Sequence, residues 1–125
     1  MNKKILLDSN ILIHLVNNEI SASKIFFEGY EYSVSIITFM EVMGFAFKDE
    51  KEENAFKEIF NKFQIYYVDI EIASQVIKIR KSKKIKLPDA IIAATSIVTG
   101  SELMTRNESD FTSIEDIKII NPFKE

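Results

Sequence analysis

Four acidic side chains stand out as candidates for chemistry: Asp8, Glu41, Asp89 and Asp110. Two of them follow segments typical of strands, and the other two lie on mostly apolar helical segments. Hard cations such as Mg²⁺ and Mn²⁺ take oxygen ligands, usually a few carboxylates completed by waters and substrate phosphates. Without a cation, converging carboxylates raise one another's pKa. The set therefore predicts a divalent-metal site able to orient a water against a phosphodiester.

Asp8 and Glu41 also have structural explanations when each is taken alone. Asp8 follows an apolar run, where parallel sheets bind ligands, but it could also cap the next helix. Glu41 is the only charged residue between Ser33 and Phe47, and burying an unpaired carboxylate there would be costly. The alternative is a capping box in which Glu41 reaches back from Thr38-x-x-Glu41 to the N-cap amide. The local sequence leaves both interpretations open.

Asp89 and Asp110 allow a similar choice. Asp89 follows Pro88 at the start of an apolar helix, where an acid can simply interact with the helix dipole. Asp110 comes shortly after a strand, with Glu108 close by, and could be an ordinary loop acid. Function is predicted from the joint placement of the four acids rather than from any one of them.

The segments that must position these acids alternate between strands and helices. We expect strands at 4–7, 32–35, 65–68, 102–105 and 117–120, and helices at 11–16, 24–28, 38–48, 50–62, 70–84 and 88–99. The pattern predicts a buried stripe of Ala55, Ile59, Phe60 and Phe63, and a second face of Ile70, Ala73, Val76, Ile77 and Arg80. This order indicates an α/β domain with a largely parallel sheet, and residues 1–125 are expected to form one domain.

The composition excludes several classes of function. The chain has 125 residues and no cysteine, which rules out disulfides, thiolate zinc sites and cysteine nucleophiles. We expect a cytoplasmic protein, because no apolar segment is long enough to cross a membrane and Asp8 interrupts the N-terminal apolar run. The single histidine, His14, lies on an apolar helix and is expected to be packed or half-exposed rather than catalytic.

One basic segment interrupts a chain whose formal net charge is −3. Its cations are Lys78, Arg80, Lys81, Lys83, Lys84 and Lys86, and no acid lies between Glu71 and Asp89. Such a segment can bind a phosphate backbone by counterion release, or it can be a solvated helix end where cations favour the dipole. Because it leads into the Asp89 helix, we predict that it contacts RNA.

Four segments resemble, in order and at the usual spacing, the four motifs of PIN-domain nucleases. They are Leu6–Asn10, Ser35–Glu41, Pro88–Thr95 and Thr105–Phe111. The resemblance covers essentially the whole chain and is greatest to VapC-type toxins of toxin–antitoxin pairs. It implies a three-layer α/β/α domain with a central, mainly parallel sheet of four to five strands in the order 3-2-1-4-5. Asp8 and Asp110 would then face each other at the first and fourth strands.

The resemblance also implies an activity and partners. The chain would be a Mg²⁺- or Mn²⁺-dependent endoribonuclease, the toxin of a type II pair, with Asp8, Asp89 and Asp110 binding the metal. Glu41 would hold the cluster or help to deprotonate the attacking water. Ser9, Thr105 and Asn107 would be hydrogen-bonding residues that shape the site. A homodimer and an inhibitory antitoxin protein are implied as partners.

Two other functions remain as alternatives. A PIN-like protein could process or bind RNA outside a toxin–antitoxin pair, although the presence of all four acids favours cleavage. A receiver-like signalling domain has a similar length and an acidic Mg²⁺ pocket. It needs adjacent acids after the first strand, where this chain has Asp8-Ser9-Asn10, and a lysine after the fifth strand, where only Lys124 follows.

Overall fold

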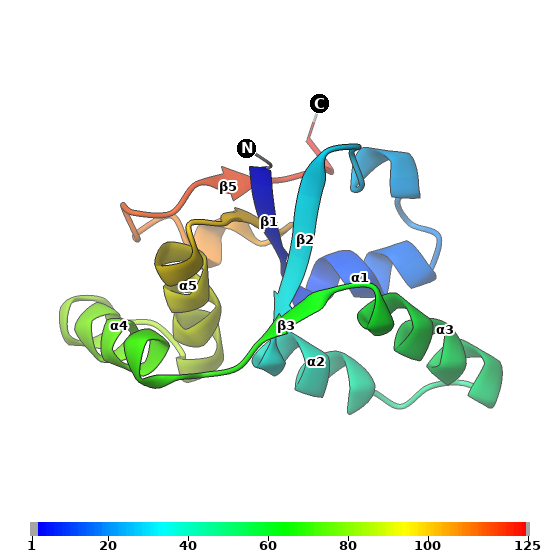
Figure 1. Cartoon of the computed structure of the whole chain (residues 1–125), viewed down its shortest axis with the longest axis horizontal. Coiled ribbons are helices and arrows are strands. Elements are labelled where there is room, and N and C mark those ends of the chain that lie inside the picture. The colour runs from blue at the N-terminus through cyan, green and yellow to red at the C-terminus, as the bar shows by residue number, and fades with distance from the viewer. Residues whose placement is uncertain (1–2, 125) are drawn as a thin grey trace.

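The protein forms one parallel sheet between two layers of helices (Figure 1), as seen in a computed structural model that describes residues 3–124. The strands are β1 (Lys3–Leu7), β2 (Tyr30–Ser35), β3 (Gln64–Tyr66), β4 (Glu102–Met104) and β5 (Ile119–Ile120). They pair in the order β3-β2-β1-β4-β5, and every pairing is parallel. The predicted α/β class and strand order are confirmed.

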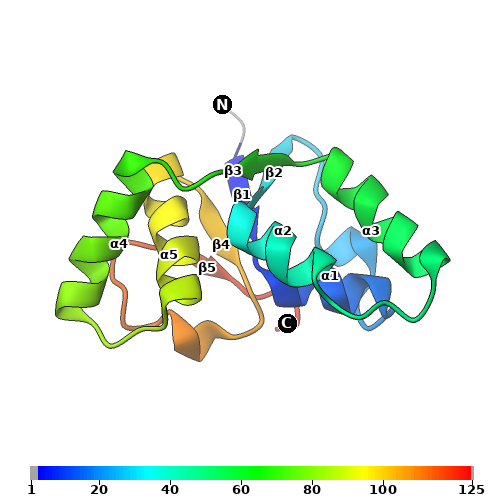
Figure 2. The same ribbon diagram turned by 90° about the horizontal axis from the view of Figure 1, so that it is seen from below.

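The helices divide between the two faces of this sheet. They are α1 (Ser9–Val16), α2 (Ile36–Met43), α3 (Glu50–Asn61), α4 (Ile70–Ser82) and α5 (Leu87–Thr99), with 3₁₀ turns η1 (Ala22–Lys24) and η2 (Glu108–Asp110). Figure 2 shows α4 and α5 on one side and α1, α2 and α3 on the other. The helix expected at 24–28 is wrong, because η1 ends at Lys24 and residues 25–29 form no helix before β2.

Strand β1 separates two hydrophobic cores. Leu6 packs with α4 and α5, whereas Ile5 and Leu7 pack with α1, α2 and α3, and all three side chains are fully buried. Successive side chains of a strand point to opposite faces. A strand buried on both faces reads as a continuous apolar run, which is why β1 was predictable.

Helix α2 begins earlier than predicted because Ser35 is its N-cap. The Ser35 Oγ accepts a hydrogen bond from the Ile37 N–H at 3.1 Å, and the helix ends at Met43 rather than continuing to Lys48. Thr38 therefore lies inside the first turn and is fully buried. The capping-box interpretation of Thr38 and Glu41 is wrong, since the cap lies three residues earlier.

Helix α4 buries a different face from the one predicted. Ile72, Val76 and Ile79 lie in the core, while Ile70 is 83% exposed and Ile77 57% exposed. Val76 belongs to both stripes, as predicted, but Ile70 and Ile72 lie about 200° apart around a helix, so the buried stripe is turned by about 100° from the predicted one. Packing against α5 selects the Ile72 face.

Helix α3 also differs from its predicted stripe. It buries Phe56 and Phe60, whereas Ala55 is exposed and Ile59 and Phe63 are partly buried. The larger Phe56 side chain takes the core position predicted for the neighbouring Ala55, because burying an aromatic ring removes far more apolar surface from water.

Helix α5 is the most buried helix and begins and ends as predicted. Pro88 lies in its first turn, and Gly100 ends it with a φ of +69°, in the left-handed region that favours glycine. It has 13 residues. None of the helices within residues 3–124 combines the length and apolarity needed to cross a membrane.

The two faces of α4 provide a matched stability test. Ile72→Ala should lower the free energy of unfolding by about 2–4 kcal/mol, because it removes a buried side chain and leaves a cavity. Ile77→Ala, the same change on the exposed face, should change it by less than about 0.5 kcal/mol. Urea denaturation measures both values. Equal losses would contradict the assignment of the buried face.

Candidate functional site

Asp8 lies where β1 and β4 end side by side. Leu7 is in register with Met104, and the Asp8 N–H donates to the Met104 carbonyl at 2.9 Å. Its Oδ1 accepts the Ser9 N–H at 2.8 Å, which makes Asp8 the N-cap of α1. Its Oδ2 accepts the hydroxyl of Thr105 at 2.8 Å. Asp8 is therefore a helix cap and also part of a polar cluster between two strands.

Asn10 joins the members of this cluster, a role that no sequence pattern assigned to it. Its Nδ2 donates to Asp8 Oδ2 at 3.1 Å and to Thr105 Oγ1 at 3.3 Å. Its Oδ1 accepts the backbone N–H of Arg106 at 3.0 Å. The one sequence signal for this role is its place in the first helical turn after Asp8.

Glu41 reaches the site from an exposed position rather than a buried one. Its Oε1 accepts the Ser9 hydroxyl at 2.8 Å, which links α2 to α1. Glu41 therefore avoids the cost of burial, because this face of α2 is open and Met40 beside it is also exposed. Ser9 is thus the contact that fixes the Glu41 carboxylate.

Asp89 and Asp110 lie close enough to affect each other. Asp89 is half-buried in the first turn of α5, and Asp110 is exposed at the end of η2. Burial raises the pKa of Asp89, and the charges of Asp110 and Glu41 raise it further, while Lys86 lowers it. Asp110 therefore lies near enough to Asp89 for its charge to act on that carboxylate.

The buried Asp8 has the same electrostatic signature. It is 7% exposed. Burial raises its pKa most, the hydrogen bonds from Thr105 and Ser9 lower it, and the charges of Asp89 and Glu41 raise it. The net direction is upward. Raised pKa values at two neighbouring carboxylates are typical of a site that concentrates negative charge for a cation.

Glu108, the acid close to Asp110, is engaged elsewhere. Its Oε2 lies 2.7 Å from Lys124 Nζ and accepts Asn121 Nδ2 at 3.0 Å. These two hydrogen bonds, the one from Lys124 first, lower the pKa of Glu108. Asp110 is therefore the acid of η2 that acts on the other carboxylates.

Asn107 connects η2 to Thr105 through its backbone. Its N–H donates to Thr105 Oγ1 at 3.1 Å, and its carbonyl accepts the Asp110 N–H at 3.2 Å. Thr105 is fully buried. The three residues predicted to shape the site, Ser9, Thr105 and Asn107, thus contact Glu41, Asp8 and the Asp110 turn.

Comparison with known proteins assigns the family. Residues 5–117 match the PIN domain. The chain belongs to the PIN domain family. It is 34% identical to a chain of a toxin–antitoxin complex from Klebsiella pneumoniae, over 97% of this chain and 99% of that one, with a TM-score of 0.78. No curated protein matches the sequence.

Two further solved structures share the fold. DNA-bound VapBC from Salmonella typhimurium has a TM-score of 0.82 at 22% identity, over 98% of this chain and 99% of that one. VapBC2 from Rickettsia felis, bound to a promoter DNA fragment, has a TM-score of 0.81 at 18% identity, over 94% and 98%. The predicted resemblance to PIN domains of toxin–antitoxin complexes is confirmed.

The donor set of this PIN domain fits a hard divalent cation held partly through water. Within residues 3–124, no three carboxylate or histidine side chains are close enough to form a ready chelating cluster. Mg²⁺ usually keeps several waters and takes only one or two carboxylates. The candidate donors here are all carboxylate oxygens, which is the donor type that Mg²⁺ prefers. Burial and then repulsion raise the pKa of Asp8 and Asp89, and a bound cation would relieve that repulsion.

The basic segment touches the site at one end. Lys86 is the N-cap of α5, and its charge lowers the pKa of Asp89. Arg80 and Lys81 lie in the last turn of α4, where the helix dipole also favours them. Lys78 and Lys83 line a separate hollow between α4 and the segment 114–116. The segment therefore runs from the rim of the site along the outside of the domain.

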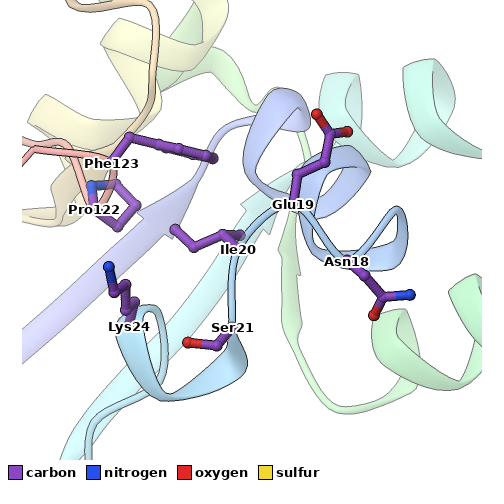
Figure 3. A pocket seen from close by; sticks show the side chains of 7 residues that line it. All are labelled: Asn18, Glu19, Ile20, Ser21, Lys24, Pro122 and Phe123. Atoms are coloured by element: carbon purple, nitrogen blue, oxygen red, sulfur yellow. The ribbon is translucent and has the colours of Figure 1, made fainter.

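A larger hollow, of about 450 Å³, lies away from the four acids. Figure 3 shows Lys24, Ser21 and Ile20 facing Pro122 and Phe123 across it. It is lined by residues after α1 and by the C-terminal segment, and it contains none of the candidate carboxylates.

The raised pKa of Asp8 predicts a stability gain when its charge is removed. A pKa raised by folding means that ionised Asp8 opposes folding above that pKa, and the opposition disappears below the pKa of the unfolded chain. Asp8→Asn, which keeps a helix-capping side chain, should raise the metal-free unfolding temperature at pH 7 by roughly 2–5 °C. The gain should shrink as the pH falls through the raised pKa. Thermal unfolding in EDTA measures it, and a lower temperature at pH 7 would contradict it.

Proposed function

We propose that this PIN domain protein is a Mg²⁺- or Mn²⁺-dependent endoribonuclease that hydrolyses RNA phosphodiester bonds. The observation that carries the proposal is the mutual electrostatic influence of four carboxylates from four separate elements. Burial raises the pKa of Asp8 and of Asp89 most, the charges of Asp89 and Glu41 raise that of Asp8 further, and those of Asp110 and Glu41 raise that of Asp89 further. A divalent cation at this place would compensate the repulsion between these carboxylates.

Asp8, Asp89 and Asp110 would hold the cation, directly or through water. A bound divalent ion supplies neutralisation of the phosphate charge and a lower pKa for a coordinated water. Thr105 and Asn10 fix the Asp8 carboxylate by donating to its Oδ2. This support leaves the carboxylate little freedom to turn away from the site.

Glu41 would hold the cluster and assist proton transfer. Its Oε1 is held by the Ser9 hydroxyl, which leaves Oε2 to accept a proton from the attacking water during in-line hydrolysis. Lys86 at the start of α5 would offset the negative charge that the RNA meets there. No histidine is needed for this chemistry.

We further propose that the protein is the toxin of a type II pair, with an antitoxin protein and a second copy of itself as partners. The 34% identical relative was solved as part of a toxin–antitoxin complex. Expression of the chain alone should arrest growth, and co-expression with a protein encoded beside it should relieve the arrest. Normal growth with intact RNA cleavage would favour RNA processing outside such a pair.

Cleavage of a mixed RNA pool tests the nuclease proposal. The protein should cut RNA with Mg²⁺ or Mn²⁺ and stop in EDTA. Asp8→Asn should reduce the rate at least about a hundredfold, because it removes a charge that holds the cation. Asp116→Asn makes the same chemical change at an exposed acid outside the cluster and should leave the rate nearly unchanged. Equal cleavage by Asp8→Asn or in EDTA would refute the carboxylate mechanism.

Replacing Lys81, Lys83 and Lys84 with Gln tests the basic segment. If each contacts one phosphate, the slope of log affinity against log salt should flatten by about 2, since each single-strand contact contributes about 0.7. Binding is measured in the Asp8→Asn chain to prevent cleavage. The control replaces Lys51 and Lys57 of α3 and Lys62, the C-cap of that helix, with Gln, which removes the same charge elsewhere. An unchanged slope of log affinity against log salt would contradict the prediction that the basic segment contacts RNA.

A further inference from the structure

Arg106 is a fixed cation beside the carboxylates that the proposed mechanism leaves unused. It directly follows Thr105, whose hydroxyl donates to Asp8. Its own backbone N–H donates to Asn10 Oδ1 at 3.0 Å, and its carbonyl accepts Asn121 Nδ2 at 3.4 Å. The main chain of Arg106 is therefore tied to the same polar cluster that holds Asp8.

The side chain of Arg106 is also held in place. Its Nη1 lies 3.2 Å from His14 Nε2, and the guanidinium carbon lies 4.6 Å from the centre of the Phe123 ring. Phe123 in turn packs edge-on against His14, with ring centres 5.0 Å apart. A stacked, hydrogen-bonded guanidinium loses little conformational entropy when it binds an anion.

No carboxylate among residues 3–124 forms an ion pair with Arg106. Two acids that share a contact residue with Arg106 have other partners. Glu108 pairs with Lys124 at 2.7 Å, and Glu19 lies 3.3 Å from His14 Nδ1. A guanidinium has five N–H donors. Arg106 is exposed, and among residues 3–124 its guanidinium has one hydrogen-bond partner, His14, through Nη1.

The contacts of Arg106 place this charge outside the carboxylate cluster. Asn10 and His14 are four residues apart and lie on one face of α1. Arg106 follows that face, with its backbone at Asn10 and its guanidinium at His14, about one helical turn (~5–6 Å) further along. The guanidinium is thus displaced along α1 from Asp8, which caps the start of that helix.

We propose that Arg106 binds the RNA phosphate adjacent to the one that is hydrolysed. The inference rests on the proposed ribonuclease function and specifies how the RNA strand is held there. The planar guanidinium matches a phosphate with paired N–H donors, and the Phe123 ring sets its plane. An RNA whose reacting phosphate lies among the acids would meet the Arg106 cation at its next phosphate. The acids would otherwise repel that phosphate and weaken binding.

Binding of a labelled single-stranded RNA to the Asp8→Asn chain over a range of salt concentrations tests this proposal. Arg106→Ala should weaken binding about tenfold at low salt and flatten the salt slope by about 0.7, the value for one single-strand phosphate. Arg106→Lys keeps the charge but lacks the planar fork, so it should keep the slope and lose part of the affinity. In the otherwise wild-type chain, Arg106→Ala should raise KM about tenfold with little change in kcat.

Lys118→Ala is the matched control. Lys118 is exposed and pairs with Glu102, which begins β4. Arg106 follows the other end of that strand, so the loss of Lys118 should change neither the affinity nor the slope. His14→Ala keeps the Arg106 charge but releases the side chain, so it should weaken binding less than Arg106→Ala and leave the slope intact.

The outcomes separate this inference from the proposed function. If the parent chain neither binds nor cuts RNA, both are wrong. If it binds and cuts RNA but Arg106→Ala has the same affinity, slope and KM, only the role of Arg106 is wrong. A lower unfolding temperature for Arg106→Ala without any change in binding would show that Arg106 merely anchors the C-terminal segment through Phe123.

Discussion

The hydrogen bond from the Thr105 hydroxyl to the Asp8 carboxylate is the contact on which the site depends. It forms because β1 and β4 are neighbours in the sheet and end at the same edge, with Leu7 in register with Met104. In a doubly wound sheet, this is the position where strand order reverses and ligands bind. The contact joins residues 97 positions apart, so the site exists only in the folded chain.

Apolar packing in the two cores offsets the free-energy cost of burying charge at this site. Asp8 is nearly buried, and repulsion from Asp89 and Glu41 adds to the burial that raises its pKa. Three donors, from Ser9, Asn10 and Thr105, offset part of that cost. Apolar packing on both faces of β1 stabilises the folded chain against the rest of that cost. Strain concentrated at a functional site and balanced by packing elsewhere is common in proteins.

The sequence was sufficient for the sheet and for nominating the acids, and it failed where two local patterns compete. Apolar runs located the strands, and the family resemblance supplied their order. On α4, two stripes with helical spacing were present, and only packing against α5 excludes the one containing Ile70 and Ile77. At α2, both Ser35 and Thr38 could cap a helix. The roles of Asn10 and Arg106 depend on contacts across more than ninety residues, which no local pattern contains.

The C-terminal segment decides how the charges after β4 are used. One cation, Arg106, and two acids, Glu108 and Asp110, lie within five residues after β4, and sequence alone gives each acid an equal claim on the site. Lys124 and Asn121 bind Glu108, which leaves Asp110 as the acid that acts on Asp89. Phe123 stacks on Arg106 and directs its charge along α1. The C-terminal residues Asn121, Phe123 and Lys124 thus give the charges after β4 different uses. Asp110 acts on Asp89, and Arg106 is held apart from it beside Phe123.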